Sequence, residues 1–401
     1  MLHLLINTGR LPTASQYYQL LLGGSLSWLI IILLSGLFLY PALSIAQSPV
    51  SDFNPATLTE LHNGFYFTGK NFLADNALPL RALFFNKWGG PFSPDSINRS
   101  DNYWKTDIAR INNGWRMAGF YRGELFIEAN KDTVEILHMT HLKQQLPVGS
   151  VFDINLNGRG FSAYGLELSK GISLNSTIEG LTAGFTVRYL RGEKIQDGSI
   201  KGKLTSTGPM SYDFNLSLDY MYDDNLIYSR RDTISGSGNG YSLDAGIKYM
   251  LNKSLSSEVL LRDIGGRIYW KDVPYTTANA TSDIKSSDNE GYQKYRPTIQ
   301  GYESYKDFIQ KIPLKTDIVF SYKQGAFTLT PTVNLIEDRP LYWIEIGHET
   351  TKYVSTMVGY NLNYHAVSIG GTYKEFLINI FSSDIDLRRI NAIGLILSYR
   401  R

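Results

Sequence analysis

Residues 211–220 read SYDFNLSLDY, and every second residue of this stretch is apolar. In an extended chain its Tyr, Phe and Leu side chains lie on one side, and its Ser, Asp and Asn side chains lie on the other. The stretches 241–249, YSLDAGIKY, and 185–189, FTVRY, repeat this alternation. Because the side chains of a β-strand point to opposite faces in turn, all three stretches predict strands with one apolar and one polar face.

Strand length and strand connections indicate what the apolar face contacts. Many predicted strands run about nine to twelve residues, the length that a tilted strand needs to cross a bilayer, whereas strands of soluble sandwiches average about five or six. Aromatic residues such as Tyr342 and Trp343 gather at strand ends, in the manner of interfacial girdles. The links 323–325 (KQG) and 363–365 (NYH) are too short for a helical crossover and predict antiparallel hairpins.

These features predict an all-β fold, a closed antiparallel up-and-down transmembrane β-barrel of about fourteen strands, within a range of about 12–16. Hydrocarbon offers no partner to backbone N–H and C=O groups, so a sheet that spans a membrane must have no free edge. The alternative is a soluble sandwich, whose apolar faces pack on each other. The barrel places Leu216 on the lipid face and Asn215 on the other.

Composition narrows the class of protein. The chain has 27 Tyr and 19 Phe, 19% charged residues and a formal net charge of +2. After residue 46 no apolar stretch of about 20 residues appears, so helices of the mature part are not expected to span a membrane. Basic runs interleaved with aromatic residues are missing, so nucleic acid is not an expected partner. The absence of cysteine is compatible with an oxidising compartment.

The N-terminal segment resembles a secretory signal peptide. Residues 28–40 read WLIIILLSGLFLY, Arg10 precedes this apolar core, and the small-residue pattern 44–46 (SIA) follows it. We expect residues 1–46 to be a signal peptide that is cleaved after Ala46. The long segment before the apolar core carries a single basic residue, so an uncleaved inner-membrane anchor is the alternative. Export together with a barrel predicts the outer membrane of a Gram-negative bacterium.

Two stretches lie outside the strand pattern and set the expected domain boundaries. Residues 47–110 contain five prolines among aromatic patches, and we expect a plug inside the barrel or poorly patterned first strands. Residues 111–401 are the expected barrel. Within it, the polar stretch at about 271–312 is expected to be a long extracellular loop. Residues 236–240, with three glycines, are expected to form a flexible turn.

A search for catalytic and metal-binding motifs finds none. The histidines are scattered, and His138 and His141, three apart on an expected strand, would point to opposite faces and could not share a metal. The motifs His-Glu-x-x-His and Gly-x-Ser-x-Gly are absent. We therefore expect no enzyme, no cofactor and no metal. An outer-membrane lipid hydrolase is the remaining enzyme hypothesis, and its turnover would be lost on removal of a single His or Ser.

Ionisable residues on the polar strand faces are the candidate functional residues. On a barrel these side chains would point into the lumen, where opposed acidic and basic groups can select solutes. The alternative is that they brace the interior through salt bridges. The candidates for lining the lumen are Arg188, Asp213, Asp219, Asp244, Lys248 and Glu345.

Short phrases of the sequence resemble a known superfamily. Residues 258–271 read EVLLRDIGGRIYWK after the hairpin 246–256, GIKYMLNKSLS, and residues 184–192 read GFTVRYLRG. These phrases are similar to ones in outer-membrane barrels of the long-chain fatty-acid transporter superfamily, which includes conjugation-protein-like and uncharacterised relatives. The resemblance covers about a third of the mature chain. It implies a fourteen-stranded barrel with an N-terminal plug, in a superfamily where some members move hydrophobic molecules and others have no known cargo. The plug sequence of that superfamily is not recognisable in residues 47–110, and no ligand-pocket residue carries over.

Two functions follow as hypotheses. The first is an outer-membrane channel or transport barrel for a hydrophobic or polysaccharide-related solute. The second is a non-conducting structural or assembly barrel of a secretion or surface-polymer export system, with a periplasmic partner. Outer-membrane lipid and the barrel insertion machinery are expected partners of either, because residues 393–399 (IGLILSY) resemble the assembly signal which that machinery binds. In the usual signal the aromatic residue is last, whereas here two arginines follow it.

Overall fold

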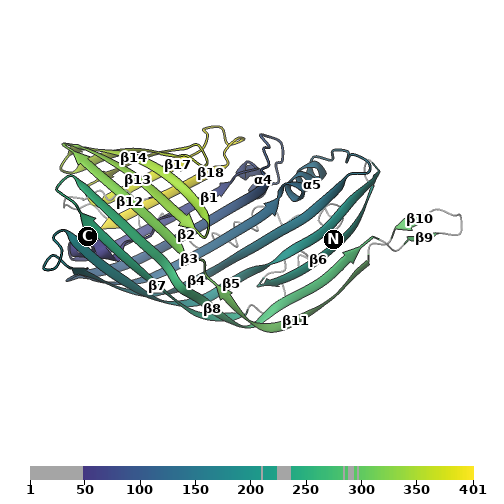
Figure 1. The fold of residues 1–401 in the computed structure, drawn as a ribbon, viewed down its shortest axis with the longest axis horizontal. Coiled ribbons are helices and arrows are strands. Elements are labelled where there is room, and N and C mark those ends of the chain that lie inside the picture. The colour runs from purple at the N-terminus through teal and green to yellow at the C-terminus, as the bar shows by residue number, and fades with distance from the viewer. Residues whose placement is uncertain (1–47, 209–210, 224–235, 283–284, 288–292, 296–297) are drawn as a thin grey trace.

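The structure, a computed structural model, describes residues 48–208, 211–223, 236–282, 285–287, 293–295 and 298–401. The expected signal peptide lies outside these residues. The described part of the chain forms a closed antiparallel β-barrel whose long axis is horizontal in Figure 1. Its helices are η1 Pro55–Thr59, α4 Leu80–Phe85 and α5 Lys131–His141. Among the described helices, none combines the length and the apolarity that a membrane span requires.

The barrel wall is one sheet whose first and last strands pair with each other. Tyr66 of the first strand lies opposite Arg400 of the last, and this pairing closes the sheet. The strands are β1 Gly64–Asp75, β2 Ile97–Asn112, β3 Trp115–Asn130, β4 Val151–Ser173, β5 Leu181–Gly208, β6 Ser211–Tyr222, β7 Ser237–Met250, β8 Leu255–Thr281, β11 Thr298–Lys311, β12 Lys315–Gln324, β13 Phe327–Ile336, β14 Arg339–Thr351, β15 Val354–Asn361, β16 Ala366–Tyr373, β17 Phe376–Ser382 and β18 Ala392–Arg400. A separate hairpin contains β9 Lys285–Ser287 and β10 Gln293–Tyr295.

At two positions around the barrel, two separate strands pair with successive parts of one long strand. β7 pairs with the first half of β5 and β6 with its second half. β12 and β11 pair in the same way with successive parts of β8. The 16 strands of the sheet, with two positions shared, therefore occupy 14 positions around the barrel. The predicted closed antiparallel barrel of about fourteen strands is confirmed.

Apolar side chains cover the outside of the barrel, as the alternation predicts. On β7, Leu243 and Ile247 are exposed, whereas Ser242 and Asp244 are buried toward the interior. The stretch 185–189 of β5 has the same arrangement. An apolar exterior and a polar interior are what a sheet surrounded by lipid requires.

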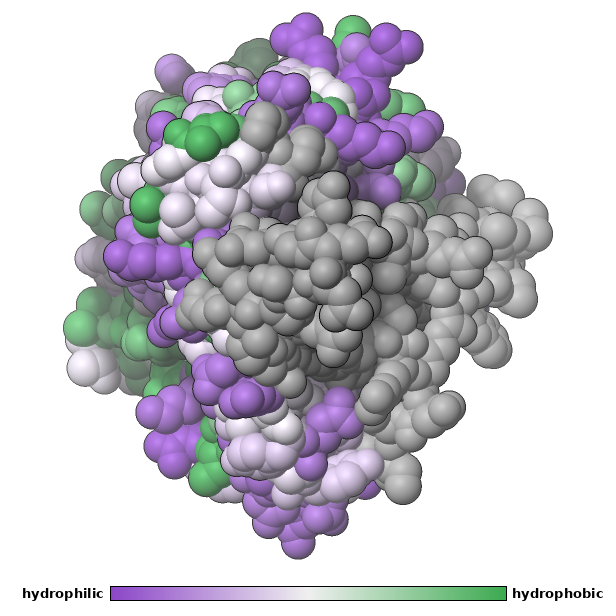
Figure 2. Space-filling model, turned by 90° about the vertical axis from the view of Figure 1, so that its right-hand side faces the viewer, coloured by the Kyte–Doolittle hydropathy of each residue, from purple (hydrophilic) through white to green (hydrophobic). Residues whose placement is uncertain are grey.

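The wall is uneven in height. β4, β5 and β8, on the side that we call the tall wall, contain 23, 28 and 27 residues. On the side that we call the short wall, β15, β16 and β17 contain 8, 8 and 7. The long strands extend past the short ones at the end that carries α4 and α5 (Figure 1, right), which we call the long-loop end. Hydrophilic side chains gather at its upper and lower rim (Figure 2). We call the opposite end, with tight turns after β2, β12 and β16 and the C-terminus, the short-turn end.

The structure corrects the expected start of the barrel at residue 111. The barrel begins at Gly64, because β1 and β2 are its first two strands, which fits the alternative of poorly patterned first strands. Of the described residues before β1, 48–62 lie inside the lumen. The prolines that obscured the strand pattern lie in the segments before β1 and between β1 and β2. Proline cannot donate a hydrogen bond to a neighbouring strand, so these segments do not continue the strands of the sheet.

The expected extracellular loop at about 271–312 is also corrected, because β8 continues to Thr281 and β11 runs from Thr298 to Lys311. These strands form the part of the wall that extends past the short strands, which we call the extended wall. Polar side chains are expected there because that part is surrounded by water. The expected turn at 236–240 is part of β7, which begins at Ser237.

Two expectations about single residues are wrong. Leu216 does not contact lipid: it is buried in a hydrophobic cluster that also contains Phe214, Leu204 of β5 and Ile136 of α5. His138 and His141 lie on α5 and not on a strand. Residues three apart on a helix lie on the same side, so these two rings are neighbours.

Candidate functional site

The N-terminal residues 48–62 lie inside the barrel and pack against its tall wall through η1. Val50, Ala56 and Leu58 of this segment are buried. The wall accepts the segment because Gly171, Gly184 and Gly246 lie directly opposite one another on β4, β5 and β7. A Cβ atom on Gly184 would lie 2.3 Å from the carbonyl carbon of Pro55, and one on Gly246 would lie 2.0 Å from Asn54 Oδ1. These glycines leave a flat surface on the inner wall, and side chains at these positions would overlap the N-terminal segment.

Ionic contacts hold the tip of this segment. Asp52 Oδ2 lies 2.9 Å from Lys105 Nζ and 3.3 Å from Arg188 Nη2. Lys70 Nζ donates a 2.7 Å hydrogen bond to the backbone carbonyl of Ser51. All of these side chains are buried, so they need their partners in place of water.

Asp52 is part of a larger cluster of buried charges in the barrel interior, which we call the charge cluster. Lys105 also contacts Glu167 at 3.1 Å, and Arg122 contacts both Glu124 and Asp263. The cations are Lys70, Lys105, Arg116, Arg122, Arg188, Arg262 and Lys315, and the carboxylates are Asp52, Asp107, Glu124, Glu167, Asp244, Asp263 and Asp317. Seven positive and seven negative groups cancel, which is the condition under which so many ions can be buried together.

The structure separates the residues that the sequence grouped as lumen-lining candidates. It brings only Arg188 and Asp244 together: Arg188 Nη1 donates a 2.6 Å hydrogen bond to Asp244 Oδ1 within the charge cluster. Lys248 lies nearer the short-turn end, with its Nζ 2.6 Å from Glu60 Oε2 and 3.5 Å from Glu258 Oε1.

The other three candidates lie apart from the charge cluster. Asp213 and Asp219 belong to β6 in the extended wall, where Asp219 is exposed and accepts a 2.7 Å hydrogen bond from Tyr275 Oη. Glu345 is on β14, in the short wall.

Sequence reasoning missed most of the charge cluster. Lys105 and Asp107 lie two residues apart on β2, and Arg116 and Arg122 lie six residues apart on β3. Each pair therefore shares the inner face of its strand. An even spacing of charged residues along a strand indicates that they share one face, and this signal was available in the sequence. Asp52 carries no such signal, because its place depends on a chain that folds back into the barrel.

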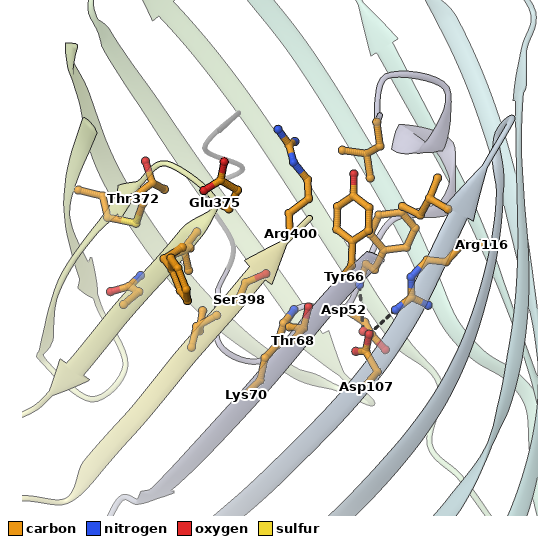
Figure 3. A pocket seen from close by; sticks show the side chains of 18 residues that line it. Asp52, Tyr66, Thr68, Lys70, Asp107, Arg116, Thr372, Glu375, Ser398 and Arg400 are labelled. Atoms are coloured by element: carbon orange, nitrogen blue, oxygen red, sulfur yellow. Dashed lines mark hydrogen bonds and ion pairs between the residues drawn. The ribbon is translucent and has the colours of Figure 1, made fainter. Parts of the chain in front are cut away.

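The lumen near the short-turn end contains polar space beside the N-terminal segment. One cavity of about 130 Å³ lies between β1, β2, β3, β17 and β18. Figure 3 shows Tyr66, Thr68 and Lys70 on its floor, with Arg116 bonded to Asp107 beside them. A second cavity, of about 320 Å³, lies between the segment and β13–β15, with Thr328, Thr330 and Thr332 among its lining residues. We call this second space the vestibule.

A further cavity, of about 240 Å³, is apolar and lies in the tall wall toward the long-loop end. Its floor contains Gly158 and Gly160 of β4 with Gly198 of β5, which lie near each other across the pairing of these strands. Glycine leaves this floor without side chains, so the space between the walls stays open. The walls are formed by Trp104, Leu125, Ile127, Leu156, Ile200 and Leu218.

Aromatic rings cluster on α5 at the long-loop end. The ring of Phe92 stacks on His138 with centroids 3.8 Å apart, and Trp88 stacks on His141 with centroids 3.9 Å apart. Burial lowers the pKa of both histidines below their ordinary value of 6.5. In the part of the chain that the structure describes, no three His, Asp or Glu side chains are placed to hold a metal ion.

Comparison with known proteins gives a family and several similar folds. The model of a family of unknown function, DUF5723, matches residues 107–374. No curated protein matches the chain. A TodX deltaS2S3 mutant, a monoaromatic hydrocarbon channel, is similar with a TM-score of 0.46 and 12% identity over 87% of this chain and 92% of that one. The Pseudomonas putida toluene transporter TodX has a TM-score of 0.44, 10% identity and the same coverage of both chains. The Ralstonia pickettii toluene transporter TbuX has a TM-score of 0.34 and 9% identity over 87% and 92%.

Proposed function

We propose a function for this chain, which belongs to the DUF5723 family of unknown function: it is a transport barrel of the Gram-negative outer membrane for hydrophobic solutes. The observation that carries this proposal is the apolar cavity in the tall wall. The closed wall supports the membrane location, because it has an apolar exterior and its first and last strands pair with each other.

The size and lining of the cavity favour a small apolar solute. An apolar cavity of roughly 150 Å³ is known to stay dry and to bind benzene. The cavity here is larger, at about 240 Å³. Most of its lining consists of aliphatic and aromatic side chains and glycines, together with polar residues that include Glu124, Lys194 and Asp223. Transfer of a hydrocarbon from water into such a space is favourable by roughly 25 cal/mol for each Å² of apolar surface that is buried.

The charge cluster explains why a polar solute is the weaker candidate for this cavity. Its buried groups are bonded to one another, so a passing ion would have to break these pairs. Because these charges are paired, uptake of an uncharged solute is a better measurement of transport than ionic current.

Toluene uptake in cells that carry the barrel tests the proposal. A Cβ atom on Gly158 would meet no heavy atom within 4 Å, so Gly158→Leu fills the cavity without a clash at the backbone. Gly119 of β3 has equally open surroundings but does not line the cavity, and Gly119→Leu is therefore a matched control. We expect the Gly158 variant to lower the rate of radiolabelled toluene uptake at least tenfold, while the Gly119 variant leaves it unchanged.

Two results would count against the proposal. Equal rates in the two variants would mean that the cavity is not the solute site. Rates no higher than in cells without the barrel would instead favour the assembly barrel, which moves no solute. Heat-modifiable gel migration of each variant shows whether the barrel has closed.

A further inference from the structure

We propose that Glu345 and four neighbouring oxygen-bearing side chains form a binding site for one monovalent cation. The site lies inside the short wall, where Ser48 and Pro49 of the N-terminal segment meet β13–β17. It is separate from the apolar cavity and from the charge cluster, and it does not depend on what the barrel transports.

Strand register brings the side chains of the site together. Thr330 of β13 is opposite Glu345 of β14, which is opposite Gly359 of β15, which is opposite Ser368 of β16. Gly359 lacks a side chain and so leaves a gap in this row: a Cβ atom there would lie 2.5 Å from Ser368 Oγ and 3.5 Å from Glu345 Cβ. The gap is a cavity of about 20 Å³, which suits one atom-sized occupant.

One acceptor beside this cavity has no donor in the described structure, and its neighbour Glu345 has only a long hydrogen bond. Asn379 of β17 donates from Nδ2 to Glu345 Oε2 at 3.4 Å, a long hydrogen bond. The other amide atom, Asn379 Oδ1, is buried without a hydrogen-bond partner in the described structure. An unpaired buried acceptor costs free energy, and a cation beside it would remove that cost.

Charge determines the class of cation. Among the described residues, no salt bridge joins Glu345 to Lys, Arg or His. One positive charge would therefore neutralise the site, whereas a divalent ion would leave a buried excess charge. Carboxylate, amide and hydroxyl oxygens, here from Glu345, Asn379, Thr330, Thr332 and Ser368, are the ligands that hard cations prefer.

A route to the site exists from the short-turn end. Glu345, Thr330 and Thr332 line both the small cavity and the vestibule. A hydrated ion that enters the vestibule can thus exchange water for these oxygens. Because Ser48 lines both spaces as well, a bound ion would also hold the N-terminal segment against the short wall.

The test is ²³Na⁺ NMR line broadening with the purified full-length barrel in detergent, using sodium chloride as the probe. We expect the wild-type barrel to broaden the sodium signal, and Glu345→Gln to lower this broadening to that of detergent alone. Thr332→Val removes one hydroxyl without changing the side-chain shape and should reduce it in part. Glu349→Gln is the matched control on the same strand, because Glu349 is exposed and pairs with Lys323 at 2.7 Å.

Thermal unfolding provides a second measurement. At equal ionic strength and pH 7.5, sodium chloride should raise the unfolding midpoint above that in choline chloride, and the difference should vanish in the Glu345 variant only. The contrary case is a proton on Glu345, shared with the amide of Asn379. Equal midpoints in the two salts, with no broadening specific to Glu345, would then overturn the cation site.

Discussion

Asp52 of the N-terminal segment and Lys105 of β2 form an ion pair inside the barrel, with Oδ2 and Nζ 2.9 Å apart. Their side chains are only 4% and 1% exposed. Removal of one partner from a buried pair leaves an uncompensated charge and typically costs about 3–5 kcal/mol. We expect Asp52→Ala to lower the free energy of unfolding by about this amount, measured by urea titration of the barrel in detergent.

Glu60 offers a control within the same segment. It pairs with Lys248 at 2.6 Å but is 39% exposed, and exposed pairs contribute only about 0–1 kcal/mol. Glu60→Ala should therefore have a small effect. If the two variants lost the same stability, burial of Asp52 in the charge cluster would not be what holds the segment.

The outer face of the barrel can be tested at Val187. This side chain is 45% exposed on β5, between the exposed residues Phe185 and Tyr189. If it lies near the bilayer midplane, Val187→Arg should destabilise the barrel by about 2–4 kcal/mol in lipid vesicles. Asn215→Arg, on an exposed position of the extended wall, should be tolerated. Equal losses at the two positions would contradict a lipid boundary at Val187.

Leu216 is expected to respond in a different way from Val187. Because Leu216 is buried within a hydrophobic cluster, Leu216→Ala creates a cavity and should cost about 2–5 kcal/mol. The loss should be the same in detergent and in lipid vesicles, since no lipid touches the side chain. A loss that appeared in lipid alone would instead place Leu216 on the membrane surface.

The packing of α5 should weaken in acid. The pKa of His138 and that of His141 are lowered in the folded protein, so between the ordinary value of 6.5 and the lowered value only the unfolded form carries the extra proton. Stability is therefore full above about pH 6.5 and decreases as the pH falls through this window. We expect hydrogen exchange of the α5 amides, corrected for intrinsic rates, to show less protection at pH 5.5 than at pH 7.5.

A double variant separates the histidines from other acid effects. His138→Gln together with His141→Gln cannot be protonated at these positions, so its α5 protection should be the same at the two pH values. Persistence of the pH dependence in this variant would show that these two histidines do not cause it.

Local patterning predicted strands in both parts of the wall, but it predicted the environment of the apolar face correctly only in the part below the extended wall. In 241–249 and 185–189 the apolar face is exposed, as the alternation indicates. In 211–220 the same alternation is present, yet Leu216 is buried in the cluster that contains Ile136 of α5, a helix that the sequence led us to regard as a strand. A period of two gives the two faces of a strand but not what covers them.

The sequence by itself determined the closed antiparallel barrel, its approximate strand number and the polar character of its interior. These properties follow from side-chain alternation, strand length and short turns, all of which act between residues near in the chain. Only the tertiary structure decided that Asp52 meets Lys105 and that Glu345 faces the gap at Gly359. The reason is that these contacts depend on strand register and on a segment that folds back into the lumen, and both are set by packing across the whole barrel.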